Sequence, residues 1–137
     1  MRRLDLPMDS IEQQFRRRVF NVIARNQDDH VKNIAFLMDK EGRWSLSPAL
    51  DVTYSFNPAG RWTATHQMSI NGKRDHFEIE DLRACARTAG MKRGRAESIV
   101  AEVGRVVARW PDYADEAGVE PGQRDQVQAA LRLGRGG

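Results

Sequence analysis

The chain has 137 residues, of which 40% are hydrophobic and 30% are charged, and its formal net charge is +3. This length is typical of one globular domain, and the chain contains neither a long apolar run of the kind that spans a membrane nor the composition of a disordered protein. The single cysteine, Cys85, excludes an internal disulfide; together with the lack of an apolar signal segment at the start, it predicts a cytoplasmic protein with no membrane contact.

The positive charge is concentrated at the beginning of the chain. Residues 1–25 contain six arginines against three acidic residues, whereas residues 26–137 hold 16 basic and 16 acidic side chains. The run Arg16, Arg17, Arg18 is expected to form a solvated helix face. A nucleic-acid protein usually has a longer basic stripe with aromatic residues between the charges, so direct binding of nucleic acid is not expected.

The first half of the chain predicts one helix and one β-hairpin. Apolar residues recur at helical spacing from Asp9 to about Arg25. Two short apolar runs, at 34–38 and 44–47, then flank the turn-like residues 39–43, which indicates a hairpin with a five-residue loop. Residues 49–72 have little periodicity and predict a long ordered loop, with one or two short strands near 68–70.

The second half predicts helices. Helical patterns run from Glu80 to Ala89, from Arg95 to Trp110, where Pro111 would end the helix, and more weakly from about Gln123 to Leu133. The expected fold is therefore mainly α with a β-hairpin (α+β), as one domain over residues 1–133. Residues 134–137 are expected to form a disordered tail.

Polar side chains that could carry chemistry gather in residues 26–33, between the first helix and the hairpin. Asp28 and Asn33 are five residues apart, the spacing of the Asp and Asn in the D-x-x-x-x-N catalytic loop of protein kinases. Asp51 follows the hairpin, and because the hairpin folds the chain back on itself, Asn33 and Asp51 are expected to converge. Carboxylate and amide oxygens suit Mg²⁺, so this set predicts a magnesium–nucleotide site.

The sequence resembles the C-terminal part of the HipA-like serine/threonine kinases, the toxins of type II toxin–antitoxin modules. The resemblance covers about residues 9–120. Its stretches are residues 20–23 (FNVI), 26–37 (NQDDHVKNIAFL), 47–55 (SPALDVTYS) and 66–73 (HQMSINGK). The fold that it implies is the isolated C-lobe of a protein-kinase-like fold.

The resemblance also implies roles for individual residues. Asp28 corresponds to the catalytic base that orients the substrate hydroxyl, and Asn33 and Asp51 correspond to ligands of Mg²⁺ in complex with ATP. His30 and Lys32 are further members of the catalytic motif. The implied reaction transfers the γ-phosphoryl group of ATP to a serine or threonine of a protein substrate, and the implied partners are that substrate and an antitoxin.

The glycine-rich loop and the lysine that hold ATP in a kinase are missing from the start of the chain. Residues 1–27 contain no glycine and no lysine. The sequence therefore predicts a truncated protein without its N-lobe, with no visible clamp for ATP. We expect such a chain to be inactive alone and to need a separately encoded N-lobe.

Three other interpretations stay open at this stage. The chain could be a non-catalytic remnant that binds an antitoxin or a partner kinase. It could be a metal-dependent phosphohydrolase that uses Asp28, Asp29, His30 and His66, although such sites usually need more ligands. Finally, Asp28 and Asp29 could simply cap a turn, with His30 as a hydrogen-bonded structural residue.

Overall fold

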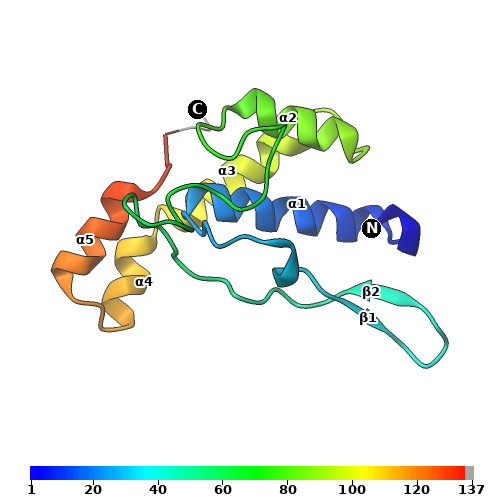
Figure 1. The fold of residues 1–137 in the computed structure, drawn as a ribbon, viewed down its shortest axis with the longest axis horizontal. Helices are drawn as coiled ribbons and strands as arrows, with labels where there is room; N and C mark the ends of the chain where they lie inside the picture. The colour runs from blue at the N-terminus through cyan, green and yellow to red at the C-terminus, as the bar shows by residue number, and fades with distance from the viewer. Residues whose placement is uncertain (135–137) are drawn as a thin grey trace.

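The computed structural model describes residues 1–134, which form mostly helices and one small sheet (Figure 1). In chain order the elements are the 3-10 turn η1 (Arg2–Leu4), α1 (Met8–Ile23), the 3-10 turn η2 (Val31–Asn33), β1 (Phe36–Met38), β2 (Trp44–Leu46), α2 (Ile79–Thr88), α3 (Arg95–Val107), α4 (Trp110–Glu116) and α5 (Pro121–Ala130). The predicted mainly helical α+β class is confirmed. The predicted disordered tail lies, apart from Gly134, outside the described residues.

The core lies where α1 packs against α3, with α2 beside them (Figure 1). The apolar stripe that predicts α1 is the stripe it buries, with Val19 fully covered, and Ile99 of α3 is equally inaccessible. α1 begins directly after Pro7, whose extended backbone precedes the first turn. The long first helix therefore serves as the support from which the polar residues that follow it are presented.

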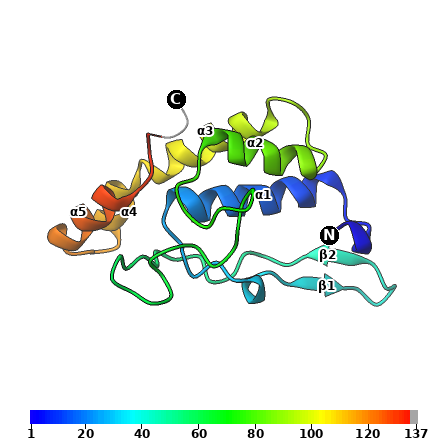
Figure 2. The same cartoon turned by 45° about the horizontal axis from the view of Figure 1, so that its top comes forward.

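The hairpin forms with the five-residue loop that the sequence predicts. β1 and β2 are antiparallel, with Phe36 opposite Leu46. The Asp39 carboxylate accepts hydrogen bonds from the backbone N–H groups of Glu41, at 3.0 Å, and Arg43, at 2.9 Å, which closes the loop. In Figure 2 the hairpin extends along the side of α1 opposite α2 and α3.

The predicted strand near residues 68–70 is absent from the described part of the chain, where this stretch has only a single bridge between Ile70 and Lys73. The reason is visible in the hydrogen bonds. The backbone N–H groups of Gln67, at 2.8 Å, and Met68, at 3.4 Å, donate to the Asp29 carboxylate instead of to a neighbouring strand. The Asp29 side chain therefore accepts the hydrogen bonds that a neighbouring strand would otherwise accept.

The C-terminal helices differ from the prediction at Pro111. α3 ends at Val107, and Pro111 lies in the first turn of a helix that the sequence did not predict, α4. α5 likewise begins at Pro121. Proline has no N–H to donate and its φ suits the first turn of a helix, so both prolines start helices here. None of the helices described over residues 1–134 is long and apolar enough to cross a membrane.

Candidate functional site

The site is built where the chain leaves α1 and meets the segment after the hairpin. Arg25 takes a left-handed conformation, with φ 57°, which turns the backbone out of the helix. The next residues then pair with Ser55: the Gln27 N–H donates to the Ser55 carbonyl at 2.9 Å, and the Ser55 N–H donates to the Arg25 carbonyl at 3.0 Å. This short parallel bridge places residues 51–55 beside the polar loop 26–33.

Asn33 joins the two parts of the site. Its side-chain Nδ2 donates to the Asp28 carbonyl oxygen at 3.0 Å and to the Asp51 carboxylate Oδ2 at 2.9 Å. The three positions that the spacing and the hairpin predicted to converge are therefore linked through one amide. Because both N–H groups of that amide are engaged, its Oδ1 is the atom that remains to bind a ligand.

Asp51 is held a second time by Asn26, which is 3% exposed. The Asn26 Nδ2 donates to the Asp51 backbone carbonyl at 2.9 Å. Asp51 itself has φ 54°, a conformation that costs energy for any residue with a Cβ and that is concentrated at functional sites. This role of Asn26 could not be predicted, because its partner is a backbone atom 25 residues away.

The remaining predicted site residues lie at the rim. Asp28 has a half-exposed side chain, and its Oδ1 is 3.8 Å from His30 Nε2, beyond hydrogen-bond distance. His30 Nδ1 is buried without a hydrogen-bond partner. Lys32 is exposed on η2. The structure thus leaves the Asp28 carboxylate accessible beside an imidazole, at one end of the loop that Asn33 closes.

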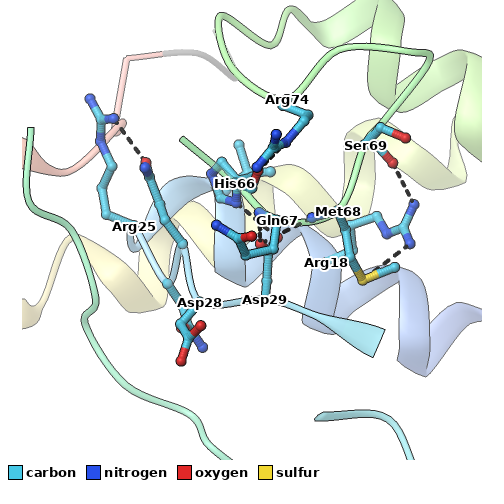
Figure 3. Close-up of polar contacts among 12 residues, drawn as sticks. Arg18, Arg25, Asp28, Asp29, His66, Gln67, Met68, Ser69 and Arg74 are labelled. Atoms are coloured by element: carbon cyan, nitrogen blue, oxygen red, sulfur yellow. Dashed lines mark hydrogen bonds and ion pairs between the residues drawn. The ribbon is translucent and has the colours of Figure 1, made fainter. Parts of the chain in front are cut away.

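A buried hydrogen bond between Asp29 and His66 lies next to this rim, and the sequence did not predict it. His66 is completely buried, and its Nδ1 donates to the Asp29 Oδ2 at 2.8 Å (Figure 3). Burial alone would raise the pKa of Asp29, but the hydrogen bonds from His66, Gln67 and Met68 outweigh it and hold that pKa below its usual value. In Figure 3 the side chain of Asp28 points away from this cluster, so the two neighbouring carboxylates have separate environments.

A cavity of about 280 Å³ lies beside the Asn33–Asp51 pair, between α1, α3 and residues 49–52. The arginines that were expected to form a solvated face of α1 line it, and that expectation is wrong. Arg16 binds Glu102 of α3 at 3.2 Å, and Arg17 donates to the Ser47 carbonyl at 2.7 Å. These long side chains reach across the groove and tie α1 to α3 and to the end of the hairpin.

The side-chain oxygens of Asn33 and Asp51 suit a hard cation that also binds the phosphates of a nucleotide. Among the described residues, no group of three or more His, Cys, Asp or Glu side chains could hold a metal ion by itself. Asp29 and His66 are hydrogen-bonded to each other, which argues against the metal site of a phosphohydrolase built on them. The oxygens of Asn33 and Asp51 fit Mg²⁺, which needs only one or two protein ligands when a nucleotide supplies the others.

Taken together, these features define a small α+β domain in which a polar loop after a helix is joined to an aspartate beyond a β-hairpin. Residues 1–110 match the HipA-like C-terminal domain, and the chain belongs to that family. The resemblance found in the sequence is thereby confirmed. None of the curated proteins matches the chain with significant similarity.

Proposed function

We propose that this domain is the C-lobe of a HipA-like serine/threonine protein kinase, which transfers the γ-phosphoryl group of ATP to a protein once an N-lobe completes it. The observation that carries the proposal is the position of Asn33, whose amide contacts both the Asp28 backbone and the Asp51 carboxylate. Such a bridge fixes the distance between a base and a metal site, which phosphoryl transfer requires.

Asn33 and Asp51 would hold Mg²⁺ through oxygen atoms. The hydrogen bond between Asn33 Nδ2 and Asp51 Oδ2 leaves the amide oxygen and the rest of the carboxylate as ligands. Asn26 fixes the Asp51 backbone from the other side. The bound ion would neutralise phosphate charge, and the chain's own part is to hold these two oxygens in a fixed relation.

Asp28 would accept the proton of the substrate hydroxyl or orient that hydroxyl for attack. Its half-exposed carboxylate is open to a substrate, while the Asn33 hydrogen bond to its carbonyl fixes its backbone. His30 would support the loop from the neighbouring position, and the exposed Lys32 would face the phosphates. Both of these roles rest on the family motif.

An N-lobe would supply the glycine-rich loop and the lysine that cover the phosphates, since residues 1–27 contain neither glycine nor lysine. By family resemblance, the partners would be a protein substrate and an antitoxin, and the module would be a toxin–antitoxin system of the cytoplasm. We expect the chain alone to bind Mg²⁺·ATP weakly and to show no autophosphorylation.

A second function is favoured by one surface. The hairpin leaves Leu37, Met38 and Trp44 between 43% and 58% exposed, although large apolar side chains are usually covered. A protein-binding module without catalysis, which docks an antitoxin or a partner kinase through the hairpin, would explain this exposure. Such a module does not require a metal at Asn33 and Asp51, so metal binding separates the two functions.

The test uses Mn²⁺ with a non-hydrolysable ATP analogue as a paramagnetic probe. On the ¹⁵N-labelled chain we expect selective broadening of amide signals from residues 28–34 and 50–52. The broadening should be lost in Asp51→Asn and retained in the control Asp112→Asn, which removes an exposed carboxylate on α4. Broadening that is spread over all acidic surfaces, or that survives Asp51→Asn, would exclude the proposed metal site.

A further inference from the structure

A chain of buried hydrogen bonds connects the polar loop to the C-terminal end of the described chain. Its first member is Asp29, which directly follows the proposed base Asp28. One carboxylate oxygen of Asp29 accepts from His66 Nδ1 at 2.8 Å, and the other accepts from the backbone N–H of Gln67 at 2.8 Å. Asp29 is 7% exposed, so these bonds form out of contact with water and hold the loop firmly.

The surroundings of His66 select one tautomer. An ionised carboxylate only accepts hydrogen bonds, so His66 Nδ1 must carry the hydrogen that faces Asp29. In the neutral ring Nε2 is then an acceptor, and it lies 2.9 Å from Nη1 of Arg132, which can only donate. The ring of Phe77 packs edge-on against His66, with 5.1 Å between ring centroids, and fixes its plane.

Arg132 completes the connection from beyond α5. It is 6% exposed, and besides His66 its Nη1 contacts the Val22 carbonyl at 3.1 Å. Its backbone N–H donates to the Ile23 carbonyl at 3.0 Å, and its Nη2 pairs with Asp75. The last turn of α1, which the polar loop follows, is therefore fixed by a residue more than 100 positions away.

We propose that Arg132 is a positioning residue for the site, and that it acts through His66 and Asp29 to set the backbone at Asp28. This inference rests on the proposed function. Arg132 lies outside residues 1–110, the part that matches the family, so this site depends on a segment that the family match does not cover. The segment that contains α4 and α5 thus belongs to the functional unit.

The contact with Arg132 requires a neutral His66 ring. Protonation would place a hydrogen on Nε2, so that two donors and two positive charges would face each other across 2.9 Å. The charged groups around the ring are Asp29 from the polar loop, Arg132 from the C-terminal segment, and Asp75 and Arg74 from the loop before α2. α1 contributes the carbonyls of Val22 and Ile23, both through Arg132.

The first test needs no metal and uses the full chain. Long-range ¹⁵N correlation spectra should show the hydrogen of His66 on Nδ1, with Nε2 unprotonated. Arg132→Gln should shift the amide signals of residues 28–33, whereas the control Arg109→Gln, an exposed arginine between α3 and α4, should not. A hydrogen on Nε2, or unchanged signals at 28–33 in a folded Arg132→Gln variant, would overturn the inference.

The second test measures the Mn²⁺ affinity of variants of Arg132 and His66. Arg132→Gln should lower the affinity about tenfold, because the Asp28 backbone that Arg132 sets also holds Asn33. His66→Gln can donate to Asp29 and accept from Arg132, so it should keep the wild-type affinity, whereas His66→Leu can do neither and should lower it as Arg132→Gln does. The control His76→Asn removes an exposed histidine and should follow the wild type.

A folded His66→Leu variant that binds Mn²⁺ like the wild type would contradict the role of the ring. Should Arg132→Gln fail to fold, Arg132→Lys retains the charge and is compared in the same way, with a smaller shift at residues 28–33 expected. Failure of the proposed function would look different: the wild type would bind no Mn²⁺, while the tautomer and the amide shifts would still decide whether Arg132 positions the loop.

Discussion

Substitutions of Asp51 separate its effect on folding from its effect on metal binding. Its side chain makes one hydrogen bond, to Asn33, and its backbone has φ 54°. Removing the hydrogen bond costs about 1 kcal/mol. Alanine tolerates the left-handed conformation less well than asparagine or glycine, by about 1 kcal/mol.

These terms give a distinct order of stabilities. Asp51→Ala loses both contributions, so its free energy of unfolding should fall by about 2 kcal/mol. Asp51→Gly loses the hydrogen bond but relieves the backbone, so it should stay within about 1 kcal/mol of the wild type. Asp51→Asn keeps an acceptor for Asn33 and tolerates the conformation, so its change should be below about 0.5 kcal/mol.

Metal affinity should follow the charge instead. All three variants lack the carboxylate, and each should lose at least about tenfold in Mn²⁺ affinity, because the site offers the ion one charged ligand. Urea unfolding followed by circular dichroism gives the stabilities, and electron paramagnetic resonance of free Mn²⁺ gives the affinities. An Asp51→Asn variant that is as unstable as Asp51→Ala, or that binds Mn²⁺ like the wild type, would refute this reasoning.

Three further predictions concern stability. Hydrogen bonds from Asn71, from a backbone N–H and from Lys73 lower the pKa of Asp81 to about 2. The stabilisation that the ionised carboxylate provides is therefore present above about pH 4 and is lost as the pH falls towards 2. Asp81→Asn should cost about 1–2 kcal/mol of unfolding free energy at pH 7 and should make the stability depend less on pH in the acid range. At the fully buried Ile99, Ile99→Val should cost about 1 kcal/mol and Ile99→Ala about 3 kcal/mol in urea unfolding, and equal costs would exclude tight packing there. Gly42 has φ 82° and open space around it, so strain alone should make Gly42→Ala lose about 1 kcal/mol of unfolding free energy, seen as a lower melting temperature, and Gly42→Asn should lose less.

The local features of the site could be predicted from the sequence, because they depend on spacing along the chain. The alternation of short apolar runs around residues 39–43 predicted the hairpin and its loop length. A hairpin returns the chain to its starting point, so the contact between Asn33 and Asp51 followed from the same pattern. The chemical role of these residues came from the kinase-like spacing and from the family motif, and it stays a proposal.

The contacts that support the site could not be predicted in this way. Asp29, His66 and Arg132 are separated by 37 and 66 residues, and no periodicity links them. A lone histidine or arginine in a sequence carries no sign that it is buried, since this depends on which segments pack around it. Pro111 was misinterpreted for a related reason, because proline can begin a helix as well as end one.

The most direct test of the account is a crystal of the full chain grown with Mn²⁺ and a non-hydrolysable ATP analogue. We expect an anomalous-scattering peak at coordination distance, about 2.2 Å, from the side-chain oxygens of Asn33 and Asp51, with the Asp28 carboxylate open towards the terminal phosphate. A peak at other residues, or bound nucleotide with no metal at this pair, would contradict the central claim that these three side chains form a magnesium–nucleotide site.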